Sequence, residues 1–410
     1  MQKTFRPFFR VLPFLLGGSL QAATYHVAAT GNDANDGKSL ATAVASLSCA
    51  VSKVMPGDDI RIASGTYACS TTISFSAVAT KDKPITVIAE DLADRPVFDF
   101  SAQGPGQKGI SLSGCFWIVK GIIIRKAGDN GMHIRGSGNT VEFCAFQENR
   151  DSGLQLSNGA ASNRIINCDS QGNADPADYG DADGFACKMD VGSGNYFFGC
   201  RAWLNCDDGW DGYLRGADNV TTTLENCWTW KNGYFKDGTD AGARANGNGF
   251  KMGGSDNKQA RHHFILKNCL AFENKSKGFD QNSNKGAMTL YNCTAHNNVG
   301  SNYSIGSSLA AGSKLILVNC VELGNKRKLL ASASLTTNSW QSPFQTTAAD
   351  FTSIDSAKTA KPRNPDGSLP DISYMHLAPG SDLIGAGTDI GQSFPDPKPD
   401  LGAFQSKRLR

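Results

Sequence analysis

Four acidic residues and one lysine occupy matching places in three successive phrases of this chain. The phrases are Asp183-Gly184-Phe185, Asp207-Asp208-Gly209-Trp210-Asp211 and Gly249-Phe250-Lys251. If each phrase lies on its own strand, neighbouring phrases are about 4.8 Å apart and the four carboxylates converge. Carboxylates so close repel one another unless a cation lies between them. All-oxygen ligands on loops suit a hard ion, and Ca²⁺ tolerates irregular geometry better than Mg²⁺.

A simpler interpretation of these acids is that Asp-Gly is a common turn signal. That interpretation suffices for Asp36 and Asp366, each of which precedes a Gly. It does not explain acids stacked in register on successive repeats. The phrases lack the spacing and the distal Glu of an EF-hand. We therefore predict a calcium site whose ligands are Asp183, Asp207, Asp208 and Asp211.

Lys251 shares the position after the aromatic residue with Asp211. A lone lysine on a repetitive β protein is usually a solvated surface residue. Lys251, however, is predicted to lie one repeat away from Asp211 and next to the calcium site. We therefore predict that Lys251 is a catalytic group.

The elements that position these residues follow from a repeat. A cysteine is followed five positions later by an asparagine seven times, at Cys144/Asn149, Cys168/Asn173, Cys200/Asn205, Cys227/Asn232, Cys269/Asn274, Cys293/Asn298 and Cys320/Asn325. Successive cysteines are 24, 32, 27, 42, 24 and 27 residues apart, the period of a solenoid with insertions. Each repeat is then one coil, with the Cys buried on a short strand and the Asn amide satisfying backbone groups at a bend.

The composition favours an all-β chain. The sequence has 45 Gly and many short apolar runs bounded by Gly, Asn, Asp and Ser. A solenoid grows lengthwise without a second core, and no low-complexity linker divides the chain. We predict a single-stranded right-handed parallel β-helix over residues 23–410 as one domain. Its N-terminal cap would cover about 23–70, its coils about 71–330 and its C-terminal cap segment about 331–410.

Residues 1–22 have the pattern of a secretory signal peptide. Lys3, Arg6 and Arg10 precede the apolar run of residues 11–16, and that run is too short to span a membrane. Removing these three charges changes the formal net charge from +2 to −1. No basic field then attracts nucleic acid or an anionic membrane. We predict a secreted monomer, extracellular or periplasmic, with neither of these partners.

The chain has 12 Cys, which in a secreted protein would ordinarily indicate disulfides. Seven of them belong to the repeat, where a stack of small apolar side chains is the better interpretation. Cys49 and Cys69 could link the N-terminal cap, and the pairing of Cys115, Cys187 and Cys206 stays open. Zinc is disfavoured because the chain has no C-x-x-C pair and its six His are scattered.

These residues resemble polysaccharide lyase family 9, the calcium-dependent pectate lyases of the parallel β-helix type. The resemblance covers most of the mature chain and is most specific at residues 182–185, 200–203, 207–211, 247–251 and 277–282, with a closing phrase at 399–404. It implies that Asp183, Asp207, Asp208 and Asp211 hold the catalytic Ca²⁺ and that Lys251 abstracts a proton. Asp400 would belong to a second, structural calcium site. The substrate implied is polygalacturonate, an acidic plant cell-wall polysaccharide of pectin.

Such a substrate explains the chemistry. The C5 proton lies α to a carboxylate, so Ca²⁺ bound to that carboxylate stabilises the developing anion while a neutral lysine takes the proton. The O4 bond then breaks by β-elimination. Lys188, Arg215, Arg244 and Lys277 are candidates to pair with other uronate carboxylates. The insertions at about residues 174–182 and 233–246 would form the walls of the groove.

Three other classes of protein share parts of this pattern. A rhamnogalacturonan lyase on the same fold would share the calcium and the lysine. A polygalacturonase would use paired carboxylates, but it needs Gly-His-Gly and Arg-Ile-Lys phrases, which this chain lacks. A non-catalytic carbohydrate-binding β-helix would leave Lys251 without a role.

Overall fold

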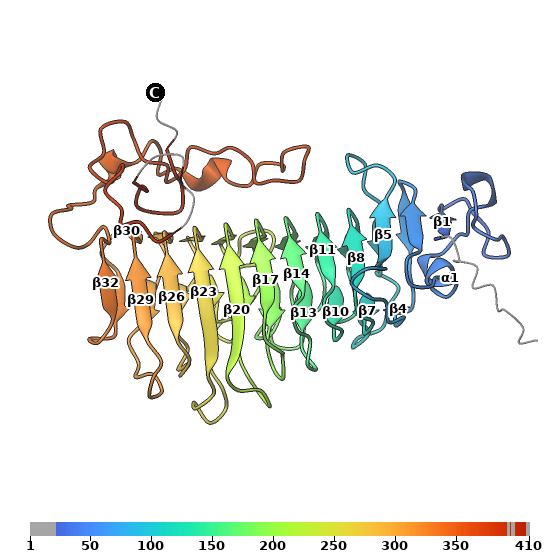
Figure 1. Cartoon of the computed structure of the whole chain (residues 1–410), viewed down its shortest axis with the longest axis horizontal. Helices are drawn as coiled ribbons and strands as arrows, with labels where there is room; N and C mark the ends of the chain where they lie inside the picture. Colours follow the sequence, from blue (N-terminus) through green and yellow to red (C-terminus); the bar gives the residue numbers. More distant parts are fainter. Residues whose placement is uncertain (1–21, 392–393, 395–397, 407–410) are drawn as a thin grey trace, which may run out of the picture.

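The protein is a rod built from three parallel sheets (Figure 1). The computed structural model describes residues 22–391, 394 and 398–406. Each coil of the chain adds one strand to sheet A, then one to sheet B and one to sheet C, and neighbouring strands pair in parallel. The predicted all-β parallel β-helix is confirmed. The predicted signal peptide lies outside the described residues, except for Ala22.

The strands are short, as the spacing of the apolar runs predicts. Sheet A contains β1 (Thr24–Val27), β2 (Asp59–Ile62), β5 (Ile85–Ala89), β8 (Trp117–Lys120), β11 (Thr140–Glu142), β14 (Arg164–Ile166), β17 (Asn195–Phe198), β20 (Val220–Glu225), β23 (His262–Lys267), β26 (Met288–Tyr291), β29 (Leu315–Val318) and β32 (Ser334–Thr336). Sheet B contains β3 (Thr66–Ala68), β6 (Val97–Asp99), β9 (Ile123–Arg125), β12 (Ala145–Gln147), β15 (Asp169–Gln171), β18 (Arg201–Trp203), β21 (Trp228–Trp230), β24 (Leu270–Phe272), β27 (Thr294–His296) and β30 (Val321–Leu323). Sheet C contains β4 (Ile73–Phe75), β7 (Ile110–Leu112), β10 (Met132–Ile134), β13 (Leu154–Leu156), β16 (Phe185–Cys187), β19 (Trp210–Asp211), β22 (Phe250–Lys251), β25 (Lys277–Asp280), β28 (Ser301–Ile305) and β31 (Arg327–Leu329).

Each repeat cysteine follows a sharp corner between sheets A and B. The residue before it has a positive φ in all seven repeats, at Phe143, Asn167, Gly199, Asn226, Asn268, Asn292 and Asn319. Gly and Asn adopt this left-handed conformation most easily, which explains why they dominate the position. The seven cysteines are buried, as predicted. All twelve cysteines are free thiols, so Cys49 and Cys69 are not linked.

The asparagines form a continuous ladder at the bend between sheets B and C. The side-chain oxygen of Asn173 accepts from the backbone N and the Nδ2 of Asn149, and this pattern continues through Asn298. The prediction for the seventh pair is wrong. Asn298 donates to Asn302 instead, whereas Asn325 is exposed and accepts from Arg327. Asn302, near the start of β28, instead carries the ladder on, because its Nδ2 donates to Glu322 and to the backbone oxygen of Leu323 in the next coil.

Aromatic side chains stack along the interior face of sheet C. The ring of Trp210 lies 4.8 Å from that of Phe185 and 5.0 Å from that of Phe250, measured between centroids. The stack continues through Phe279 to Tyr303. All of them except Tyr303, which follows Asn302, are the residues that follow Gly in the repeat. The stack holds the register of the strands that carry the acidic phrases.

The two ends of the chain cover different parts of the rod. Helix α1 (Leu47–Val51) buries Leu47 and Ala50 against the first coils. The C-terminal segment, the described residues after Thr336, packs over sheet B and contains the short helices η2 (Ala348–Asp350) and η3 (Ser356–Lys358) (Figure 1). A third short helix, η1 (Leu40–Thr42), precedes α1. The helices of the described part are all too short or too polar to span a membrane.

A buried ion pair fixes the C-terminal segment to the middle of the rod. Arg201 and Arg363 both donate to Asp169, with N–O distances of 2.8 Å. Arg363 also donates to the backbone oxygens of Cys168 and Gly199. Each charged group here is paired and hydrogen-bonded, as burial requires.

Strands extend from Thr24 to Thr336, so they also lie within the predicted N-terminal and C-terminal caps. The limits of these caps stay a prediction.

Candidate active site

The acidic phrases lie on neighbouring strands of sheet C. Phe185 pairs with Trp210 and Trp210 with Phe250, so the register predicted from the Gly-aromatic pairs is confirmed. In the same register Asp211 lies directly beside Lys251. Asp183, Asp207 and Asp208 precede β16 and β19, at the bend that the asparagine ladder shapes. The repeat thus brings the four acids and Lys251 together, although they belong to three successive coils.

Three of the four predicted metal ligands form a compact cluster. Oxygen atoms of Asp183, Asp207 and Asp208 all lie within 4.8 Å of one another, and the three side chains are buried. The backbone N of Asp208 donates to Asp183 Oδ1 at 3.2 Å. Asn248 donates to Asp208 Oδ1 from both its backbone N and its Nδ2, at 2.7 and 2.8 Å. These N–H donors are neutral, so they orient the carboxylates without cancelling their negative charge.

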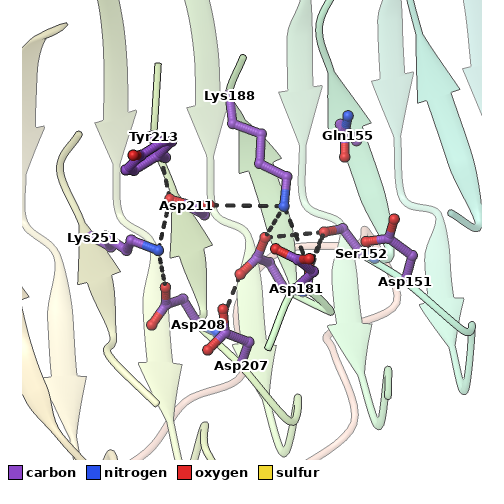
Figure 2. Close-up of polar contacts among 12 residues, drawn as sticks. Asp151, Ser152, Gln155, Asp181, Lys188, Asp207, Asp208, Asp211, Tyr213 and Lys251 are labelled. Atoms are coloured by element: carbon purple, nitrogen blue, oxygen red, sulfur yellow. Dashed lines mark hydrogen bonds and ion pairs between the residues drawn. The ribbon is translucent and has the colours of Figure 1, made fainter. Parts of the chain in front are cut away.

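Asp211 lies between two lysines at the edge of the cluster (Figure 2). Lys251 Nζ is 3.3 Å from Asp211 Oδ1 and 3.0 Å from Asp208 Oδ2. Lys188 Nζ is 3.7 Å from Asp211 Oδ2 and 2.8 Å from Asp183 Oδ2. The structure therefore brings all four predicted ligands and Lys251 together. It also adds Lys188, which the sequence analysis assigned to substrate binding.

The electrostatics of the cluster differ between its members. Burial, reinforced by the neighbouring acids, raises the pKa of Asp183 to about 8 and raises the pKa of Asp207 well above its usual value. Burial opposes the charged forms of Asp211 and Lys251 as well. At Asp211 the neighbouring Lys251 and Lys188 outweigh burial and lower the pKa, and at Lys251 the neighbouring Asp208 and Asp211 outweigh burial and raise the pKa. Four ionised carboxylates would carry more charge than the two lysines neutralise, and burial together with this repulsion disfavours full ionisation of the cluster.

A cation fits this set of groups. The donors are carboxylate oxygens, which hard divalent ions prefer. Two buried oxygens of this site, Asp208 Oδ2 and Asn248 Oδ1, accept no hydrogen bond from the described residues, although Lys251 Nζ lies close to the former. Unsatisfied buried oxygens and carboxylates with raised pKa values are both relieved by a bound positive ion. Asp183, Asp207, Asp208 and Asp211 would hold it.

A groove of about 620 Å³ reaches the edge of the cluster at Asp211. Lys188, Asp211 and Lys251 line its floor together with Tyr213 and Gln155. The two insertions meet beside it, where the ring of Tyr179 contacts that of Phe235 at 4.9 Å between centroids. Residues 175, 180, 181 and 246 of these insertions also line the groove, as the predicted walls require.

Of the remaining predicted substrate-binding residues, one lines the groove and two do not. Arg215 lines the groove, is 58% exposed in its side chain and pairs with Asp256 at 2.8 Å. Arg244 is 73% exposed and pairs with Asp178 on the opposite insertion, and Lys277 pairs with Asp280. Neither Arg244 nor Lys277 is among the residues that line the groove.

Asp400, predicted as a weak structural metal ligand, lies in the C-terminal segment. Its carboxylate accepts from the backbone N of Gly385 at 2.7 Å and of Ser406 at 2.6 Å. Within the described residues, the two groups of three acids that could hold an ion do not include Asp400. Its role as a metal ligand stays a prediction.

Several residues of the site were missed by the sequence analysis. Ser152 Oγ donates to Asp183 Oδ2 at 3.0 Å, and Asn246 donates to Asp207 from its backbone N. Ser152 and Asn248 each precede a Gly one coil away from an aspartate, so the same alignment contained a signal for both. Asn246 lies in an insertion, where the repeat gives no register.

Comparison with known proteins places the chain among right-handed β-helix lyases. It matches the family described as "Pel9A-like, right handed beta helix region" over residues 25–325. It is 39% identical to pectate lyase L of Dickeya dadantii over 405 residues, covering 95% of this chain and 92% of that protein. It is 38% identical to pectate lyase L of Paenibacillus polymyxa over 396 residues, covering 91% and 85%.

Two solved structures are similar over most of the rod. The crystal structure of pectate lyase Pel9A has a TM-score of 0.86 at 38% identity and covers 94% of this chain and 97% of its own. A rhamnogalacturonan lyase has a TM-score of 0.75 at 25% identity, with 88% and 98% covered. The chain therefore belongs to the Pel9A-like right-handed β-helix family. The predicted resemblance to polysaccharide lyase family 9 is confirmed.

Proposed function

We propose that the protein is a pectate lyase that cleaves polygalacturonate by β-elimination, with Lys251 as the base. The observation that carries this proposal is the position of Lys251 Nζ, 3.0 Å from Asp208 and 3.3 Å from Asp211 at the floor of the groove. Relatives that are 38–39% identical over nearly the whole chain are named pectate lyases, which supports the same conclusion.

The ion at Asp183, Asp207, Asp208 and Asp211 would be Ca²⁺. Buried carboxylates on bends offer an irregular set of oxygens, which Ca²⁺ accepts more readily than Mg²⁺. When bound, Ca²⁺ would neutralise the uronate carboxylate next to C5 and offset the acids that keep Lys251 protonated.

The chain's own residues then account for the proton transfer. Lys251 must lose its proton to act as a base, and the nearby carboxylates raise its pKa in the structure. Asp208 and Asp211 hold its Nζ in one place, and the ring of Tyr213 lies 5.8 Å from the Nζ. The amine takes the C5 proton, the electron pair of the C5–H bond forms the C4–C5 double bond, and the C4–O4 bond breaks with its electron pair leaving on O4. No water is consumed.

Arg215 is the best placed of the predicted residues to pair with a neighbouring uronate, because it is exposed and lines the groove. Arg244 and Lys277 would contact only a longer polygalacturonate chain.

A rhamnogalacturonan lyase is the second candidate function, favoured by the similarity of the whole rod to a structure of that name. The pattern of residues 1–22 supports secretion.

Ultraviolet absorbance of the unsaturated product tests the proposal directly. We expect absorbance to rise with polygalacturonate and Ca²⁺, to stop with chelator and to return poorly with Mg²⁺. A parallel assay on rhamnogalacturonan separates the two candidates. Full activity in chelator would refute the calcium assignment, and Asp208→Asn should weaken Ca²⁺ binding more than it weakens the fold.

Lys251→Arg tests the base. Arginine keeps the positive charge but cannot become a neutral base, so turnover should fall by about 10²–10⁴-fold while Ca²⁺ binding persists. The native rate should rise toward alkaline pH, because the raised pKa of Lys251 must be overcome, and the variant's residual rate should not follow. Turnover close to native in Lys251→Arg would assign the base elsewhere.

A further inference from the structure

Lys188 is a second buried ammonium group in the acidic cluster. It comes from the end of β16, one coil before Asp211. Its Nζ lies 2.8 Å from Asp183 Oδ2, 3.3 Å from the backbone oxygen of Asp181 and 3.7 Å from Asp211 Oδ2. Figure 2 shows Lys188 and Lys251 on opposite sides of Asp211. The two lysines are thus shared by one set of carboxylates.

The surroundings of Lys188 do not match those of a substrate-binding lysine. Its side chain is only 8% exposed, whereas that of Arg215 in the same groove is 58% exposed. An ammonium group has three donors, and three protein oxygens surround this one. Ser152 donates to the same oxygen of Asp183 and so fixes the acceptor. Lys188 is therefore engaged before any substrate arrives.

The charges explain why a fixed cation is useful there. Asp183, Asp207, Asp208 and Asp211 carry four negative charges when ionised, and Lys251 must give up its positive charge to act as a base. Without Lys188, a divalent cation would leave the site with a double negative charge. A uronate carboxylate would then be repelled from the ion that it must bind.

We infer that Lys188 is a resident counter-ion of the metal site, a positioning residue that limits the negative charge felt by the bound cation and by the uronate. The inference rests on the proposed cation at the four acids. Lys188 pairs with both Asp183 and Asp211 and so offsets part of the charge of each. It thereby weakens cation binding and favours the approach of an anionic sugar.

Calcium affinity of purified full-length variants, measured by titration calorimetry without substrate, tests this inference. Lys188→Gln removes the charge and keeps a donor for Asp183, and Lys188→Met removes both. We expect Lys188→Gln to bind Ca²⁺ at least about tenfold more tightly, a lower limit for removing one like charge within a few ångströms. Lys188→Arg, which keeps the charge, should stay within about threefold of native.

Lys120→Met is the matched control for loss of one positive charge. Lys120 pairs with Glu142 on sheet A, away from the groove, so its loss should leave Ca²⁺ affinity unchanged. In steady-state assays at saturating Ca²⁺, Lys188→Gln should raise the KM for polygalacturonate more than it lowers kcat. Lys188→Met then shows whether the hydrogen bond to Asp183 adds to the effect of the charge.

The outcomes separate this inference from the proposed function. If the native protein binds no Ca²⁺, the proposed cation itself is wrong. If the native protein binds Ca²⁺ and Lys188→Gln binds it equally well or more weakly, the counter-ion role is overturned. A raised KM with unchanged Ca²⁺ affinity would instead make Lys188 a substrate-binding residue, and this result also overturns the inference.

Discussion

Replacing Asn274 with Ala should interrupt the asparagine ladder between Asn232 and Asn298. Asn274 Oδ1 accepts from the backbone N of Asn232 at 3.2 Å and from its Nδ2 at 2.9 Å. Asn274 Nδ2 donates to Asn298 Oδ1 at 2.9 Å. In the variant the Nδ2 of Asn232 keeps Thr229 as an acceptor, but its buried backbone N–H loses the oxygen it used.

The expected loss in the free energy of unfolding follows from these lost hydrogen bonds. One buried N–H without an acceptor costs about 1–3 kcal/mol, and each ordinary hydrogen bond lost adds about 1 kcal/mol. We therefore expect the free energy of unfolding to fall by about 2–4 kcal/mol. Asn325→Ala is the matched control, because Asn325 follows a repeat cysteine at the same spacing but is exposed and outside the ladder. Asn325 has a φ of 54°, which alanine adopts less easily than asparagine, so this variant should lose about 1 kcal/mol, still less than Asn274→Ala.

Urea unfolding followed by tryptophan fluorescence measures both variants, with Ca²⁺ held constant so that binding does not alter apparent stability. The kcat of folded Asn274→Ala should remain close to native, since the side chain does not line the groove. Equal midpoints for Asn274→Ala and Asn325→Ala would refute the structural role of the ladder. Lost activity at unchanged stability would indicate a catalytic role instead.

Two other predictions concern buried titratable side chains, Asp169 and His262. Burial opposes the charge of Asp169, but Arg363 and Arg201 lower its pKa to about 2, so the stability it contributes should be lost as pH falls from about 4 toward 2. Asp169→Asn should cost about 3–5 kcal/mol and expose the C-terminal segment to limited proteolysis; unchanged proteolysis would contradict this. Burial lowers the pKa of His262 to about 4, and its unfolded value is about 6.5. The unfolded state therefore binds more protons between these values, and unfolding midpoints should fall as pH drops from about 6.5 to 4, a dependence that His262→Gln should reduce.

The parts of the fold that repeat could be predicted from the sequence. Cys227 and Asn232 recur in phase with Cys269 and Asn274, so one coil predicts the next, and the same register brought Asp211 beside Lys251. The register failed where the repeat ends, because Asn302 rather than Asn325 completes the ladder. The register of the repeat predicts only contacts between equivalent positions of successive coils, and not contacts made by other residues.

Contacts of that kind are long-range or lie in insertions. Arg363 reaches Asp169 across 194 positions of sequence, and no local pattern marks either residue. Arg244 pairs with Asp178 on a different insertion, which removes it from the groove to which the sequence analysis assigned it. For Lys188, the number of carboxylates around the ammonium distinguishes a counter-ion from a substrate contact, and that number depends on side-chain packing.

The C-terminal segment also has a consequence for the order in which the molecule is assembled. Trp228, Trp230 and Phe272 on sheet B are buried by Tyr374, Met375 and Leu377, which are synthesised long after the coils they cover. During synthesis these aromatic rings face solvent on an otherwise complete rod. An exposed apolar strip of this kind favours association between nascent chains. We expect a chain that stops before Phe351 to build its coils and its acidic cluster yet to aggregate through sheet B.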